Sequence, residues 1–212
     1  MNTPAQLVIL LLLLNTCALP AAGNMNLLLR LAAAQGILTA LVLPLLPTGL
    51  DWARALLFSL AVLGIKGLCF PWLLGRISRR WTAPAEPRFS RNISMPAILL
   101  ALIFALWLET RLPPTPVVFP FLLFPAAFCA IFAGLALVAG RMHAIAQVIG
   151  CLAVENGIFL LGTPLMSPDG FWIEMLVLLA ALGAVCVMGI TADHMGKAFE
   201  SIDVRRLRIL KD

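Results

Sequence analysis

The stretch HAIAQVIGCLAVENGIFLLGT, residues 143–163, decides the fold. A helix needs about 20 mostly apolar residues to cross roughly 30 Å of hydrocarbon, and this run has that length. Its one carboxylate, Glu155, lies near the centre. Because backbone polar groups in lipid must be satisfied within the segment, we predict a transmembrane helix here.

Six further apolar runs cover about 3–21, 26–47, 53–75, 94–111, 117–140 and 171–192. Over the 212 residues, 62% are hydrophobic and only 12% are charged, against about 25% charged residues in a soluble protein. A soluble domain of this size cannot bury that much apolar surface. We therefore predict an all-α polytopic membrane protein with about seven transmembrane helices.

The first run has an apolar core that is typical of a signal peptide. Residues 1–6 contain no Lys or Arg, although signal peptides begin with a positively charged region. A retained first helix is favoured, and a cleaved one is the alternative.

The polar stretch 76–93 divides the chain into three helices (1–75) and four helices (94–192), followed by a basic tail (193–212). If this loop is cytoplasmic, twelve of the fifteen Lys and Arg residues face the cytoplasm. This asymmetry follows the positive-inside rule, so the N-terminus is predicted outside and the C-terminus inside. Membrane orientation thus explains the net charge of +5 better than nucleic-acid binding does.

Glu155 is the first candidate for function. A carboxylate within the membrane is costly unless it pairs, hydrates or protonates, and such an acid suits a proton relay. The alternative is a neutral acid that only bonds a neighbouring helix. Asn156, beside it, joins the candidate proton-translocation residues.

Lys66, in Gly64-Ile65-Lys66-Gly67, is the second candidate because it lies mid-run. Pro71 lacks an N–H and is expected to free the carbonyl of Gly67, which predicts a local break lined by polar groups. Lys66 is predicted to partner a carboxylate in this chain or in another subunit, unless it snorkels to the interface.

Other ionisable groups lie near the ends of the runs. His143 is a third candidate that would relay protons from the cytoplasm, together with Asp193 and His194; a hydrated interface is the alternative. Interfacial solvation accounts for Glu109, Arg111 and Glu174. Two lines of small residues at four-residue spacing predict close helix packing: Ala32, Gly36 and Ala40, and Ala126, Ala130 and Gly134.

Motifs for catalysis or cofactor binding are missing from the sequence. It has no Walker loop, no H-E-x-x-H and no G-x-S-x-G, and its five cysteines include no C-x-x-C pair. No catalytic residue, cofactor or metal site is therefore predicted for the chain alone.

From about residue 117 onward the order Arg141, Gly150, Glu155 and then Ser201-Ile202-Asp203 resembles the small K subunit of complex I. The whole chain resembles hydrogenase-4 component E through Val154-Glu155-Asn156-Gly157-Ile158-Phe159 and the segment 66–76. That family belongs to group 4 [NiFe]-hydrogenases and formate hydrogenlyase-type complexes.

This resemblance implies a non-catalytic membrane-arm subunit in a bacterial inner membrane. Its partners would be antiporter-like subunits, a subunit like the H subunit of quinone oxidoreductase, and NiFe and iron–sulfur subunits. Glu155 is then the mid-membrane acid of a proton or sodium path. The complex I subunit has a second buried Glu, whereas Leu176–Ile190 holds none, so a partner would supply that acid.

Three alternatives remain. The chain is a subunit of a multi-subunit cation/proton antiporter, a stand-alone transporter of a small solute, or a structural membrane anchor. A transporter often shows an inverted repeat and a central polar site, whereas this sequence has no convincing repeat between 1–75 and 94–192 and few central polar groups to hold a solute.

Overall fold

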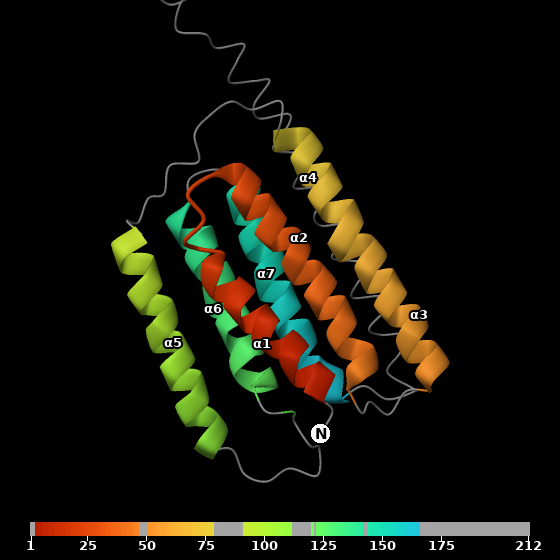
Figure 1. Cartoon of the computed structure of the whole chain (residues 1–212). Helices are drawn as coiled ribbons and strands as arrows, with labels where there is room; N and C mark the ends of the chain where they lie inside the picture. The colour runs from red at the N-terminus through yellow and green to blue at the C-terminus, as the bar shows by residue number, and fades with distance from the viewer. Residues whose placement is uncertain are drawn as a thin grey trace, which may run out of the picture.

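The structure, a computed structural model, describes residues 3–46, 51–78, 91–111, 120, 122–141 and 144–165. These residues are helical apart from short connections (Figure 1). The helices are α1 Thr3–Ala18, α2 Met25–Val42, α3 Trp52–Val62, α4 Phe70–Ser78, α5 Arg91–Arg111, α6 Leu123–Gly140 and α7 Ala144–Gly162. Short segments η1 Leu43–Leu45 and η3 Thr163–Leu165 extend α2 and α7, and η2 Leu63–Cys69 joins α3 to α4.

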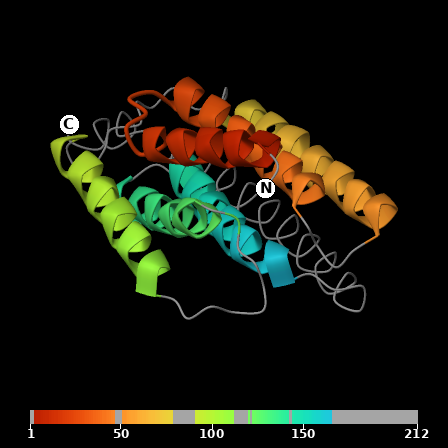
Figure 2. The same cartoon turned by 60° about the horizontal axis from the view of Figure 1, so that its bottom comes forward.

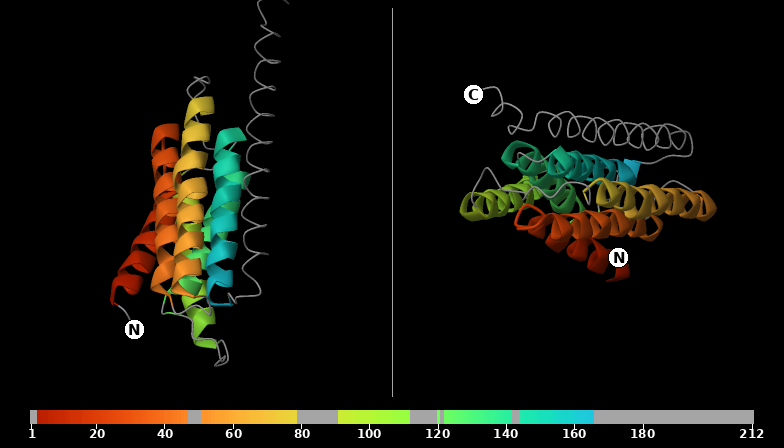
Figure 3. Two further views of the ribbon diagram at one scale, coloured as in Figure 1. Left: turned by 90° about the vertical axis from the view of Figure 1, so that its right-hand side faces the viewer. Right: turned by 90° about the horizontal axis from the view of Figure 1, so that it is seen from above.

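The helices run side by side in an up-and-down bundle. Seen along the bundle, α1 and α2 lie on one side and α6 and α7 on the other (Figure 3). The continuous α3–η2–α4 rod and α5 lie at the opposite ends of this arrangement, as Figure 2 also shows. The all-α prediction is confirmed for the described residues.

Four described helical segments are long and apolar enough to cross a membrane: Met25–Leu45, Trp52–Arg76, Leu123–Gly140 and Ile145–Gly162. Large apolar side chains stay exposed on the outside of the bundle, as expected of a surface that faces lipid: Leu7, Leu57, Leu68, Trp72 and Leu100 are more than half exposed. By length and composition, these four helices are compatible with a membrane protein.

Four predicted ends differ from those in the structure. The run 117–140 begins later, at Leu123, because Pro120 is not helical and Leu122 has φ 69°, a left-handed turn that opens α6. The loop 76–93 is shorter, because α4 extends to Ser78 and α5 starts at Arg91. The first helix ends at Ala18, before Pro20. The run 171–192 and the tail 193–212 lie outside the described residues.

Buried apolar side chains form three clusters that fill the bundle. One joins α4 and α7 to the α1–α2 connection and contains Phe70, Leu74 and Ile149. A second joins α1 and α6, and a third packs Phe58 of α3 and Phe159 of α7 around Ala40. These clusters hold α2, η2 and α7 together, and the candidate residues lie on these elements.

Candidate functional site

The structure brings Lys66 and Glu155 together. Lys66 Nζ on η2 lies 2.6 Å from Glu155 Oε1 on α7, and the side chains are 2% and 23% exposed. Both residues are in candidate membrane spans, near the middle of each. The pair is neutral overall, and the attraction between its charges offsets part of the cost of holding each charge in an apolar medium.

The snorkelling alternative for Lys66 is wrong. Its side chain is buried and directed at α7, and its Nζ also lies 4.8 Å from the centre of the Phe159 ring. Glu155 and Phe159 are four residues apart, so they share one face of α7. One helix face therefore offers the ammonium group both a carboxylate and the negative face of an aromatic ring.

A π-helical turn carries Lys66. The predicted break at this position is wrong: η2 remains hydrogen-bonded, but in a wider register in which Phe70 N donates to Ile65 O. In that register residue 71 would donate to Lys66 O, and Pro71 has no N–H to give. The carbonyl affected by Pro71 is therefore that of Lys66, not that of Gly67. Single π turns of this kind occur frequently at functional sites.

Gly36 lets α2 approach the same turn. A Cβ at Gly36 would lie 2.6 Å from Lys66 O, so only glycine fits. On the opposite side, a Cβ at Gly67 would lie 3.1 Å from the Ile37 side chain. The predicted line of small residues on α2 thus packs against the backbone of Lys66 and fixes the depth of the lysine in the bundle.

The second line of small residues packs α6 against α7. A Cβ at Gly150 would lie 2.7 Å from Gly134 O, and one at Gly157 would lie 2.6 Å from Ala127 O. Ala126 and Ala130 are fully buried. The predicted close packing is confirmed at Gly36 on α2 and at Gly134 on α6, and the α6 contact fixes the helix that carries Glu155.

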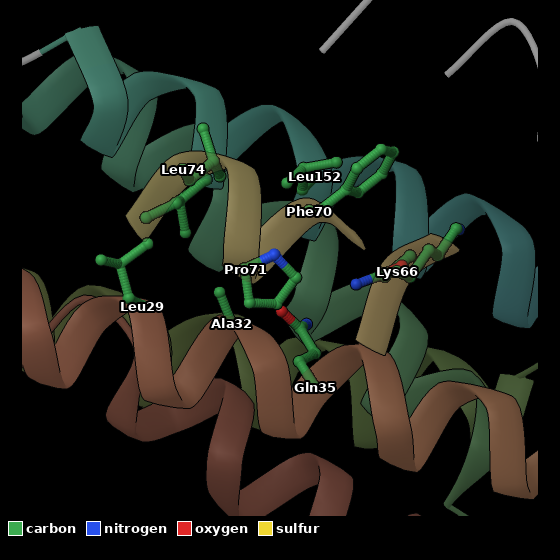
Figure 4. A pocket seen from close by; sticks show the side chains of 10 residues that line it. Leu29, Ala32, Gln35, Lys66, Phe70, Pro71, Leu74 and Leu152 are labelled. Atoms are coloured by element: carbon green, nitrogen blue, oxygen red, sulfur yellow. The ribbon is translucent and has the colours of Figure 1, made fainter. Parts of the chain in front are cut away.

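A small cavity opens beside the ion pair, between α2, η2–α4 and α7 (Figure 4). Its volume suits about one water molecule. Three of its lining side chains are polar: Gln35, Lys66 and Asn156. The others are apolar: Leu29, Ala32, Phe70, Pro71, Leu74, Ile149 and Leu152.

The polar atoms around the cavity are only partly satisfied by the described residues. Asn156 Oδ1 and Glu155 Oε2 are buried and accept no hydrogen bond from that part of the chain. Gln35 Nε2 donates to Thr16 Oγ1 at 3.4 Å, which ties the cavity to α1. Both atoms are acceptors on α7, and they lie on neighbouring residues beside the lysine of η2.

The other predicted residues lie elsewhere. His143, Asp193 and His194 are outside the described residues, and so is Glu174. Glu109 and Arg111 are at the C-terminal end of α5, away from the ion pair. Among the described residues, the structure therefore assembles Lys66, Glu155 and Asn156, and the relay role of His143 stays a prediction.

Sequence reasoning missed Gln35 and the role of Arg141. Gln35 is a polar residue within an apolar run, and that signal marks it for attention. Arg141, which the sequence analysis used for the resemblance and counted among the basic residues that set the orientation, is buried, and its guanidinium donates to the carbonyls of Pro20 and Ala22. It thereby ties the α6–α7 turn to the α1–α2 connection.

The chain is similar to the uncharacterized protein Rv0085 of Mycobacterium tuberculosis. The two are 32% identical over 202 residues, which cover 89% of this chain and 87% of the other. No family model matches the chain. No solved structure matches it.

Proposed function

We propose that this chain, which belongs to the same family as the Rv0085 protein, is a membrane-arm subunit of a complex-I-related hydrogenase assembly. In this assembly it contributes to proton or ion translocation and couples the redox arm to antiporter-like subunits. It carries seven transmembrane helices in a bacterial inner membrane, with the N-terminus outside and the C-terminus in the cytoplasm.

The observation that carries the proposal is the buried ion pair of Lys66 and Glu155, with Nζ 2.6 Å from Oε1. Intramembrane ionisable residues mark ion pathways and proton relays, and they face the interior of the bundle or one another. A structural anchor needs no such pair, since apolar residues of similar volume are often as stable or more stable.

The mechanism follows from the pair. While Glu155 is ionised, Lys66 holds it by charge. When Glu155 gains a proton, this attraction disappears, and the lysine becomes a charge that a neighbouring subunit can sense or compensate. A change of charge in a partner would likewise change the proton affinity of Glu155, and this reciprocity is what coupling requires.

The resemblance in residues 154–159 supports the assignment to a hydrogenase complex, and the helix ends support the orientation. The start of α2 and the ends of α4 and α6, which hold or adjoin Arg30, Arg76 and Arg141, lie at one end of the bundle (Figure 1). The start of α3 and the end of α5, which hold Arg54 and Arg111, lie at the other. The end with Arg30, Arg76 and Arg141 is assigned to the cytoplasm.

Two measurements test the proposal. Purification in mild detergent followed by mass spectrometry is expected to recover antiporter-like and hydrogenase subunits with the chain. Recovery of the chain alone, as a stable homo-oligomer, would contradict it. In membrane vesicles, Glu155→Gln is expected to reduce coupled proton translocation to background, whereas the control Glu109→Gln on α5 leaves it unchanged.

A further inference from the structure

The ring of Phe159 is the second group on α7 that attracts the Lys66 ammonium. Nζ lies 4.8 Å from the ring centre, within the distance of about 6 Å over which the face of an aromatic ring attracts a cation. Lys66 is 3% exposed and Phe159 is 9% exposed. Because both residues are buried, little water screens this attraction, and it is stronger than at an exposed site.

The packing around Phe159 fixes the position of its ring. The ring belongs to the buried cluster that also contains Phe58 of α3, Ala40 of α2 and Val62 of α3. Phe58 is fully buried, and the centres of the two phenylalanine rings are 5.8 Å apart. A close-packed interior leaves little room for a ring to move, so the Phe159 ring keeps its place when the charge on Glu155 changes.

The carboxylate and the ring attract the ammonium in different ways. The attraction of Glu155 depends on its negative charge, so it is lost in large part when the carboxylate gains a proton. The attraction of Phe159 comes from the fixed quadrupole of the ring, which does not titrate. Of these two neighbours on one face of α7, only the ring attracts Lys66 equally in both protonation states of Glu155.

The charged residues on the other helices packed against η2 cannot replace the carboxylate. They are Arg30 on α2, Arg54 on α3 and Arg76 on α4, and all three are cations like Lys66. At about 1.5 Å per residue, Arg54 and Arg76 are separated from Lys66 by roughly 15 Å or more along the bundle. Arg30 is separated by roughly 9 Å from Gly36, the residue of α2 that packs against Lys66 O.

We propose that Phe159 is a positioning residue: its ring holds the Lys66 ammonium group against α7 while Glu155 gains and loses its proton. The positive charge then stays at one depth in the bundle, and a proton taken up by Glu155 changes the net charge of the pair from zero to +1. The role in coupling rests on the proposed function, whereas the contact between ammonium and ring stands on the geometry alone.

Solid-state NMR on the full chain in lipid bilayers tests whether the ring holds the ammonium group. With ¹⁵N in the lysine side chains and ¹³C in the phenylalanine rings, a nitrogen–ring dipolar coupling reports the contact, and its loss in Lys66→Met and in Phe159→Leu assigns it. The coupling is expected to persist through the pH range in which the Glu155 carboxyl signal changes from carboxylate to acid. Glu155→Gln, whose side chain is neutral at every pH, is expected to retain it as well.

Loss of the nitrogen–ring coupling as Glu155 gains its proton would overturn the proposal. If the carboxyl signal does not change over the pH range in which the chain stays folded, Glu155→Gln decides, and loss of the coupling there would overturn the proposal. Normal translocation in Glu155→Gln together with a persistent coupling would overturn the proposed function and leave the contact.

Fluorinated phenylalanine at position 159 tests the role of the ring in coupling. Fluorine atoms keep the ring apolar and close to its size but draw electron density from its face, which weakens its attraction for a cation. Replacement of Phe159 by 3,4,5-trifluorophenylalanine is expected to lower proton translocation in vesicles several-fold, and 4-fluorophenylalanine to lower it less. A residue that only fills the core would tolerate both.

The matched control is the same replacement at Phe128 on α6, which packs against three other rings: Phe104, Phe124 and Phe132. Translocation is expected to stay unchanged there. Full translocation with the trifluorinated ring at position 159 would overturn the role of Phe159 in coupling. Equal losses at positions 159 and 128 would show an effect of packing and would overturn it too.

Discussion

Two contacts, α6 with α7 and α2 with η2, both depend on a glycine at the point of closest approach. They differ in the side chains that they position. In both, a glycine brings the backbone of one helix against a carbonyl of the other: Gly150 against Gly134 O, and Gly36 against Lys66 O. Around the first contact the side chains are apolar, whereas the second positions a buried ammonium group. Close glycine packing therefore sets the distance between helices, and the neighbouring residue decides whether a charge is placed there.

The largest effect is expected where the ion pair is broken. Glu155→Gln removes the carboxylate from beside a lysine side chain that is only 2% exposed, so the free energy of unfolding should fall by about 3–5 kcal/mol. Lys66→Met should cost less, because the carboxylate that it leaves behind belongs to a side chain that is 23% exposed, whereas the Lys66 side chain is 2% exposed.

Unfolding in mixed micelles, with a double-mutant cycle over Lys66 and Glu155, measures these costs. The double variant is expected to recover part of the stability that Glu155→Gln loses. A cost of Glu155→Gln below about 1 kcal/mol, as for an exposed pair, would contradict the burial of the lysine.

The next effect separates the two glycine contacts. Gly36→Ala and Gly134→Ala both force a methyl group against backbone, and each should lower the free energy of unfolding by about 1–3 kcal/mol. Only Gly36→Ala displaces the turn that carries Lys66, so it should reduce proton translocation more. Equal losses of translocation in vesicles, at matched stability, would show that the two contacts do not differ in this way.

A smaller effect of opposite sign is expected at Gly75 in α4, where a Cβ would have no neighbour within 4 Å. Gly75→Ala should raise the free energy of unfolding by about 0.5–1 kcal/mol, because alanine loses less backbone freedom in a helix. The same unfolding assay checks it, and a loss of stability would reveal a contact at this site that the structure does not contain.

The smallest effect is expected at Ser59, whose Oγ donates to Ala40 O at 2.6 Å between α3 and α2. Hydrogen bonds between membrane helices contribute about 0.6 kcal/mol on average. Ser59→Ala should therefore lower the unfolding free energy by about that amount and leave translocation intact. A loss of translocation would extend the functional region from η2 to α3.

The sequence predicts the helices, both lines of small residues and the two buried charges, since each depends on local composition or on spacing along one helix. It does not predict that Lys66 and Glu155 meet, because that depends on how α2 and α7 pack around η2. The π turn was also missed: Pro71 marks a disturbed hydrogen bond, but only the wider register of η2 shows that the carbonyl affected is that of Lys66.

Arg141 is a second residue whose contacts the sequence does not predict. The positive-inside rule places it near the cytoplasm but says nothing of its partners. Its bonds to the Pro20 and Ala22 carbonyls join segments that are far apart in the sequence. Such contacts can be identified only from the folded structure, whereas counts of charged residues predict only the side of the membrane on which a segment lies.

Solid-state NMR on the protein in lipid bilayers, with ¹⁵N in the lysine ammonium groups and ¹³C in the glutamate carboxyl groups, tests the central claim most directly. The chain has three lysines and five glutamates, so few signals compete. A strong nitrogen–carbon dipolar coupling is expected that vanishes in Lys66→Met and in Glu155→Gln, as a 2.6 Å contact between Nζ and Oε1 requires. A spectrum without that coupling, or one in which it survives both substitutions, would contradict the ion pair and the account built on it.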